Sequence, residues 1–252
     1  MLKITCVCST LFLSALVKKG YFYRLMMRKF LLFIFLASPF YGWTQMSLND
    51  LEIERIPQKK VLEFVQHQMV AHHFTAFEEI QPTLTDVNQT TGFRTHRATY
   101  HVKSTLPKVW QGYQNANPSE SWEGKRFSFG FAFNRNKEEL VYRENTNGSG
   151  VEEGQMFYVN LKLMAGVYNL AVAFEIITVD PEQKVMEFSY LEGGQSKGMQ
   201  RIELVENHKG QTDIIHTSFF KSDSKFRDAV LYPFFHKRII NEFHRRMRKR
   251  FK

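Results

Sequence analysis

The sequence has little cysteine. Its only two thiols are Cys6 and Cys8, and both lie in the N-terminal segment. The rest of the chain can therefore form no disulfide, thiolate nucleophile or cysteine-ligated metal site, and the lack of thiols fits an oxidising compartment. No serine stands in a nucleophile elbow. No glycine-rich phosphate loop occurs either, since the pair Gly193–Gly194 is typical of a turn. These absences exclude several classes of enzyme.

Acidic residues are scarce at both ends of the chain. Residues 1–44 hold six basic residues and no acidic one, and residues 236–252 hold eight basic residues beside the single acidic Glu242. The formal charge of +9 therefore belongs to the two ends, and residues 45–235 sum to −4. This distribution argues against a basic nucleic-acid-binding face, so we expect no nucleic-acid partner.

The N-terminal segment has the three-part pattern of a secretory signal peptide. From Met26 a short basic start is followed by the apolar run FLLFIFLASPF and a polar exit. The run is shorter than the roughly 20 residues that span a bilayer. We predict an exported protein, periplasmic or secreted, with cleavage near Thr44–Gln45 and a translation start at Met1, Met26 or Met27. The alternative is an anchor retained in the membrane.

The chain after this segment divides into a helical extension, residues 45–94, and a main domain, residues 95–252. In the extension, apolar residues at spacings of three and four predict a helix over Pro57–Phe77, and the polar Thr83–Gly92 predicts a loop. We expect this helix to pack on the main domain.

The main domain begins with alternating residues that predict strands. The pattern of period two starts at Thr95, and a short helix follows near Pro107. Turn residues such as Asp180–Pro181 then separate short strands whose close connections predict an antiparallel meander. The predicted strands are Phe127–Phe133, Leu140–Glu144, Gln155–Met164, Val167–Val179, Lys184–Leu191, Met199–Val205 and Thr212–Phe220.

The chain ends with its strongest helical pattern. Apolar residues recur on one side, which predicts a long helix packed on the sheet by several aromatic side chains. Pro233 predicts a kink or the true first turn. The expected stripe is Phe226, Val230, Phe234, Ile240, Phe243, Met247 and Phe251, and it is widened by Leu231, Phe235 and Ile239.

This order of elements resembles the START/Bet v 1-like (SRPBCC, helix-grip) superfamily. More narrowly, residues 152–207 look like the DUF1990 family, with a glycine before a long strand pair, a Val-Asp-Pro turn and an F-x-Y-x-x-x-G strand end. The resemblance implies an α+β fold in which a curved antiparallel sheet wraps around the C-terminal helix. It also implies a cavity between them, where members of the superfamily often bind lipids, sterols or other apolar molecules.

Five residues are candidates for lining such a cavity. Tyr168 and Phe174 share one face of their strand, Tyr190 and His216 lie on other central strands, and Phe234 lies on the final helix. If that strand face points inward, Glu175 points to solvent. For the polar members, ordinary half-buried strand packing is the competing interpretation.

No cofactor or metal site is predicted. His72 and His73 are neighbours, but adjacent residues on a helix point about 100° apart and do not chelate one ion easily.

The basic run at the C-terminus suggests a weak contact with an anionic membrane surface. The simpler explanation is that its cations interact favourably with the dipole of the helix.

The sequence therefore favours an exported domain that binds an apolar or amphipathic small molecule between sheet and helix. The alternative is a structural or interaction protein with a filled core, whose basic tail contacts an anionic surface. An enzymatic role ranks third, because no acid–base pair is placed together by the sequence; convergent polar groups with shifted pKa values in a cavity would favour it.

Overall fold

The computed structural model describes residues 45–145, 150–224 and 227–251. The predicted signal or anchor segment, residues 1–44, lies outside the described residues, as does Phe226 of the predicted helical stripe. Among the described residues no helix combines the length and the apolar character needed to cross a membrane.

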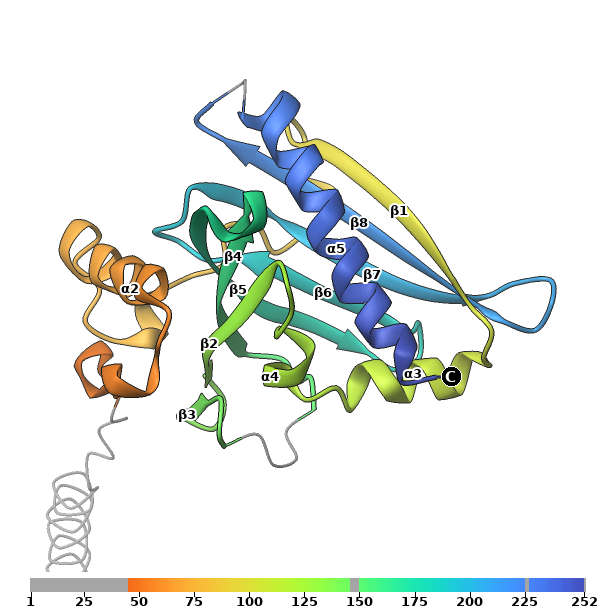
Figure 1. The fold of residues 1–252 in the computed structure, drawn as a ribbon, viewed down its shortest axis with the longest axis horizontal. Coiled ribbons are helices and arrows are strands. Elements are labelled where there is room, and N and C mark those ends of the chain that lie inside the picture. Colours follow the sequence, from red (N-terminus) through yellow and green to blue (C-terminus); the bar gives the residue numbers. More distant parts are fainter. Residues whose placement is uncertain (1–44, 146–149, 225–226, 252) are drawn as a thin grey trace, which may run out of the picture. The chain divides into compact units, whose positions relative to one another are not determined.

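One antiparallel sheet of eight strands forms the frame, in the order β1-β8-β7-β6-β5-β4-β2-β3 (Figure 1). Strands β4 to β8 follow one another as a meander, and β1 pairs with β8. The short helices α3 (Leu106–Gln114) and α4 (Pro118–Ser121) carry the chain from β1 to β2 at the other end of the sheet. The strands are β1 Arg94–Val102, β2 Phe127–Asn134, β3 Glu139–Tyr142, β4 Gln155–Leu163, β5 Tyr168–Asp180, β6 Val185–Tyr190, β7 Ser196–Glu206 and β8 Thr212–Ser222.

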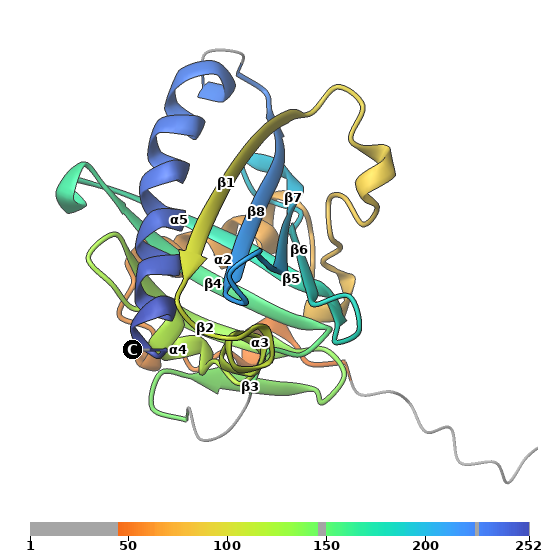
Figure 2. The same ribbon diagram turned by 90° about the vertical axis from the view of Figure 1, so that its right-hand side faces the viewer.

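The long C-terminal helix α5 (Tyr232–Lys249) lies along the inner face of this curved sheet (Figure 2). A sheet with this curvature and a helix across it is the helix-grip fold, so the predicted fold class is confirmed. The main core lies between α5 and the sheet, with Ile239 and Met247 on the helix side. Pro233 stands in the first turn of α5, directly after a helical turn, Arg227–Leu231, that runs into this helix.

The predicted stripe of this helix is wrong in its first part. Arg227–Leu231 forms one π-helical turn before α5, and this wider turn shifts the phase of the residues around it. Val230, inside this turn, is 50% exposed. Phe234 is 51% exposed because it lies six residues before Ile240 within α5, about 120° around the helix from it, whereas His236 and His244 lie on the buried face.

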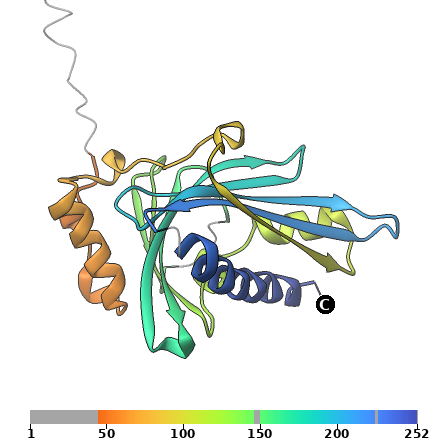
Figure 3. The same ribbon diagram turned by 90° about the horizontal axis from the view of Figure 1, so that it is seen from above.

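The other face of the sheet is covered by the N-terminal extension. Helix α2 (Lys59–Ala71) packs against β4 and β5, so that α2 and α5 lie on opposite sides of these strands (Figure 3). The helix is shorter than predicted, because His73 adopts a left-handed φ of 59°. The remaining elements are short 3₁₀ turns: η1 Leu48–Asp50, η2 Ile53–Arg55, η3 Phe77–Glu79, η4 Val87–Gln89 and η5 Met164–Gly166.

A β-bulge in β2 allows α2 to approach closely. The register shifts between Phe129 and Phe131, so Phe127 and Phe129 face α5 whereas Phe131 and Phe133 face the extension. A Cβ on Gly130 would lie 2.8 Å from the carbonyl oxygen of Tyr158 and 3.0 Å from a methyl group of Val61 on α2. Glycine is therefore required at this point of the strand.

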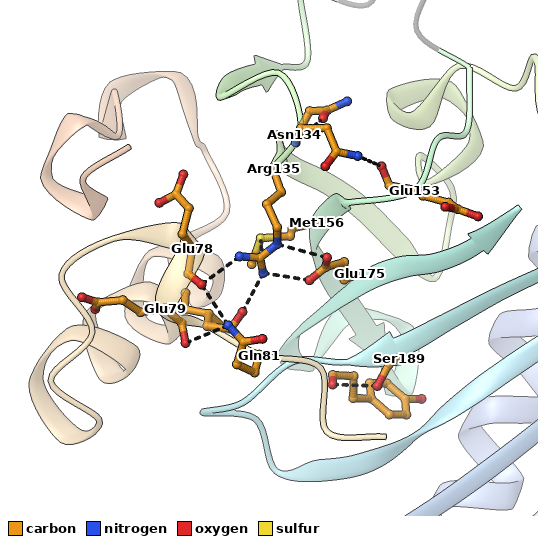
Figure 4. A network of polar contacts seen from close by, with 12 residues as sticks. Glu78, Glu79, Gln81, Asn134, Arg135, Glu153, Met156, Glu175 and Ser189 are labelled. Atoms are coloured by element: carbon orange, nitrogen blue, oxygen red, sulfur yellow. Dashed lines mark hydrogen bonds and ion pairs between the residues drawn. The ribbon is translucent and has the colours of Figure 1, made fainter. Parts of the chain in front are cut away.

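An ion pair beneath the extension links it to the sheet (Figure 4). The guanidinium of Arg135 donates to both carboxylate oxygens of Glu175, at 3.2 and 2.9 Å. It also donates to the backbone carbonyls of Glu78 and Ile80, both at 2.8 Å. Glu175 does lie on the face opposite Phe174, but the expectation that it points to solvent is wrong, because the extension covers it.

Replacing Arg135 with methionine should lower the free energy of unfolding by about 2–4 kcal/mol, because the buried carboxylate of Glu175 and two carbonyls lose their partner. Urea unfolding measures this. The matched control is Lys60→Met, which breaks the exposed Lys60–Glu63 pair and should change stability little. Equal effects of the two substitutions would show that the Arg135 pair does not hold the extension.

Candidate functional site

A cavity of about 420 Å³ opens between the β4–β5 hairpin and the first turns of α5. This volume is within the range of small-molecule sites, about 300–1,000 Å³. Its wall is mostly apolar: Leu161, Leu163, Met164, Leu170 and Val172 from the hairpin, and Leu231, Phe235 and Ile239 from the helix side. Gln195, Ser196 and Arg227 also line it.

The inner end of this cavity is polar. Tyr190 from β6 meets Tyr232 and His236 from α5 there, and the two tyrosine oxygens are 2.5 Å apart. The rings of Tyr232 and His236 stack, as residues four apart on a helix can. A smaller space of about 40 Å³ continues past Tyr190 and His236 to Gln200, His216 and Phe174.

Behind the cavity, a chain of buried hydrogen bonds crosses from α3 through α5 to the sheet. Tyr113 bonds His244 Nδ1 at 2.7 Å, and His244 Nε2 bonds His216 Nδ1 at 2.7 Å. His216 Nε2 lies 2.7 Å from Gln200 Oε1, which His236 Nε2 also contacts at 3.0 Å. The amide nitrogen of Gln200 donates to the Tyr190 hydroxyl at 3.1 Å, which joins the chain to the cavity.

The orientation of the Gln200 amide fixes every proton in this chain. Oε1 only accepts, so His216 and His236 each carry a proton on Nε2. Nδ1 of His216 must then accept from His244 Nε2, and Nδ1 of His244 accepts the hydroxyl proton of Tyr113. His216 and His244 are thus neutral, each in a single tautomer, and burial, which lowers the pKa of His236, keeps that ring neutral as well.

Two polar groups at the inner end have hydrogen-bonding capacity to spare. Tyr190 accepts from Gln200, and only one proton is used between the Tyr190 and Tyr232 oxygens, so one of these two hydroxyl protons has no acceptor among the described residues. Nδ1 of His236 is buried and likewise has no partner within the described ranges. The cavity therefore ends at an unused donor, beside a histidine with an unused acceptor.

The pKa values of these groups agree with a dry, uncharged interior. Burial lowers the pKa of His244 to about 3, and it lowers the pKa values of His216 and His236 well below the ordinary histidine value. Burial also raises the pKa of Tyr190 to about 12, and it raises that of Tyr232 well above the ordinary tyrosine value. All five groups are neutral near pH 7.

The five predicted cavity residues occupy different places. Tyr190 lies where the larger cavity meets the smaller one, and His216 and Phe174 line the smaller one. Tyr168 lies at the outer rim and is 53% exposed. Phe234 lines a neighbouring surface groove on α5. Their part in binding stays a prediction.

Sequence reasoning missed the residues that organise the site: Gln200, Tyr232, His236 and His244. Three of these lie on α5 at intervals of four residues, together with Ile240. Aromatic polar residues at spacings of four and eight would have been the signal, but the more numerous phenylalanines suggested a purely apolar stripe. Among the described residues no three histidine, cysteine, aspartate or glutamate side chains gather in a way that could hold a metal ion.

No family model matches the chain, and no curated protein matches it. Solved structures do. Ginseng major latex-like protein 151 from Panax ginseng is 9% identical, with a TM-score of 0.47 over 64% of this chain and 98% of that one. Norcoclaurine synthase from Thalictrum flavum, in complex with dopamine and hydroxybenzaldehyde, is 14% identical, with a TM-score of 0.45 over 67% and 93%. A protein of Nitrosospira multiformis is 10% identical, with a TM-score of 0.42 over 63% and 97%.

The first two of these neighbours have the Bet v 1-like fold. Their sequence identities and TM-scores are too low to support an inference about the function of this chain. The assignment of the helix-grip fold rests on the strand order of the sheet and on the helix that crosses it.

The buried histidines predict a loss of stability on acidification. Below pH 6.5 the unfolded chain takes up protons that the folded protein excludes, so each such histidine lowers the free energy of unfolding by up to about 1.4 kcal/mol per pH unit. For His244 this loss continues down to its folded pKa of about 3. Urea unfolding between pH 7.5 and about pH 5, where most carboxylates stay ionised, should show the slope.

The variant His244→Gln should reduce the slope of unfolding free energy against pH by the contribution of one buried histidine. A wild-type stability that stays constant over this pH range would contradict the assignment of three neutral histidines.

Proposed function

We propose that this domain binds an uncharged, largely apolar small molecule that carries one hydrogen-bond acceptor, such as a carbonyl or a hydroxyl group. The observation that carries the proposal is the apolar cavity that ends at the unused tyrosine proton. The apolar body of the ligand would lie between the β4–β5 hairpin and α5, and its acceptor would reach the Tyr190–Tyr232 pair.

The neutral chemistry of the inner end supports an uncharged ligand group. An ionised group at the inner end would leave water without gaining an opposite charge, because the tyrosines and histidines there are neutral. The guanidinium of Arg227, which also lines the cavity, donates to Ser222 and Gln195. A carbonyl or hydroxyl oxygen instead accepts the spare tyrosine proton, and a hydroxyl could in turn donate to a nearby unpaired nitrogen. An acid–base role has less support, because the pKa values of these histidines and tyrosines are shifted away from neutrality, where they exchange protons poorly.

The alternative, a structural protein that acts through its basic tail, has less support. Arg250 forms an ion pair with Glu120 at 2.9 Å, and Arg246 donates to the backbone carbonyl of Glu120 at 3.0 Å. Two cations of the tail are therefore engaged within the protein itself.

We make two further proposals, one about the family of the chain and one about its export. We place the chain near the DUF1990 family within the Bet v 1-like superfamily, on the motifs of residues 152–207. We also propose export, because residues 1–44 have the pattern of a signal peptide. Mass spectrometry of the mature N-terminus tests export: cleavage near Thr44–Gln45 supports it, and an intact N-terminus on a protein in the cytoplasm overturns it.

A bulky side chain in the cavity should block binding. Replacing Leu170 with tryptophan fills space between the hairpin and α5, so the affinity for a neutral fluorescent probe such as phenylnaphthylamine should fall about tenfold or more. Val70→Trp, on the exposed face of α2, is the matched control and should leave the affinity unchanged. An equal probe affinity in both variants and the wild type would mean that the probe binds elsewhere.

The tyrosine pair should distinguish between ligands of equal length. A long-chain methyl ketone should displace the probe about tenfold better than the corresponding alkane, as one hydrogen bond implies. Tyr232→Phe alone leaves the Tyr190 hydroxyl as the terminal donor, so the double variant Tyr190→Phe/Tyr232→Phe is the one expected to abolish the preference. Displacement by the alkane should remain; a ketone preference that survives in the folded double variant rules out this role.

A further inference from the structure

The exposed apolar residues of the protein gather at the mouth of the cavity. Eight large apolar side chains are exposed among the described residues, and six of them lie on two segments: the tip of the β4–β5 hairpin and the start of α5. Val167 is 85% exposed and Met164 67%. The six are Met164, Val167, Tyr168, Val230, Leu231 and Phe234.

The two segments face each other across the opening. Met164 and Leu231 both line the cavity, and both also line a surface groove of about 920 Å³ that continues along α5 past Phe234. Figure 3 shows the tip of the β4–β5 hairpin extending beyond the rest of the sheet, on the side where α5 lies. The six residues therefore form one apolar rim, named here the mouth rim.

Cations surround the mouth rim. The groove is lined by Lys125, Arg126, Lys162 and Arg238, and by no aspartate or glutamate. Arg126 pairs with the buried Glu242 at 2.8 Å, whereas Lys125, Lys162 and Arg238 have no carboxylate within salt-bridge distance among the described residues. The guanidinium of Arg238 lies 3.6 Å from the centre of the Phe234 ring, so charge and apolar surface are adjacent.

We propose that the mouth rim docks on a membrane surface that contains anionic lipids. Exposed apolar side chains next to unpaired cations match the boundary between acyl chains and acidic headgroups. The rim would insert Val167 and Phe234 and leave Lys162 and Arg238 at the headgroups. This contact differs from the membrane contact expected of the C-terminal tail. The proposal of membrane docking does not depend on the proposal of ligand binding.

Vesicle partitioning of the full chain tests the apolar part of the proposal. The variant Val167→Gln/Phe234→Gln should reduce partitioning into vesicles of phosphatidylglycerol and phosphatidylcholine by about tenfold or more. Its matched control is Ile53→Gln/Val70→Gln, which removes the two exposed apolar residues outside the rim and should leave partitioning unchanged. Residues 1–44 are present in every variant, so their contribution is constant.

A second pair of variants tests the charged part. Removing two cations in Lys162→Gln/Arg238→Gln should weaken partitioning about tenfold or more into anionic vesicles and little into neutral ones. The control Arg245→Gln/Lys249→Gln removes two exposed cations from the tail and should change partitioning less than about twofold. A larger loss with the tail control would overturn the proposal in favour of a tail contact.

A photoactivatable phospholipid in the vesicles gives an independent map. Cross-links should fall on residues 162–168 and 230–238, and cross-links confined to residues 45–94 or 245–252 would refute the proposal. Sedimentation without vesicles checks for a second copy on the rim: a dimer that the Val167→Gln/Phe234→Gln variant dissociates would also refute it. Probe binding without vesicles should be retained in Lys162→Gln/Arg238→Gln, whose two side chains line the groove and not the cavity, and this separates the proposal from that of ligand binding.

Discussion

The fold depends on one constraint: strands β2, β4 and β5 are apolar on both faces. Phe157 and Val159 of β4 point to one side, and Met156 and Tyr158 point to the other, where all four are buried. A sheet of this kind is stable in water only when both faces are covered. Helix α5 covers the inner face, and residues 45–94 cover the outer one. The extension is therefore part of the core and not an appendage, and the bulge at Gly130 gives its helix room to pack.

The inner face has a second requirement, because α5 brings His236 and His244 into the core. Buried polar groups need partners, and the alignment of α5 with the sheet is set by the atoms that supply them. Gln200 is central, since its amide oxygen accepts from two histidines and its amide nitrogen donates to Tyr190. A shift of the helix along the sheet would break several of these bonds together. Where this network ends, at the first turns of α5, the helix and the β4–β5 hairpin leave a cavity between them.

The sequence predicts the sheet well because its signals are local. Turn residues such as Asp180 act where they stand: its carboxylate accepts the backbone N–H groups of Glu182 and Gln183 at 2.8 Å. The parts that could not be predicted depend on distant partners. Glu175 is buried only because Arg135 and the extension meet it, and the position of Val230 depends on a π-helical turn that helical periodicity does not reveal. His216 was a candidate, but its role requires Gln200 and His244, which no spacing in the sequence connects.

The position of the cavity joins the two proposals through a physical argument. An apolar ligand that leaves a bilayer for a protein in solution must cross water, and the exposure of its apolar surface then makes up much of the barrier. A mouth whose own rim is apolar removes that barrier when the rim rests in the headgroup region, because the path from acyl chains to the hairpin and α5 stays apolar throughout. The exposed side chains at the rim cost little in the free protein, since single exposed apolar groups are common on protein surfaces. Their concentration beside unpaired cations is uncommon, and it lies where a ligand would enter.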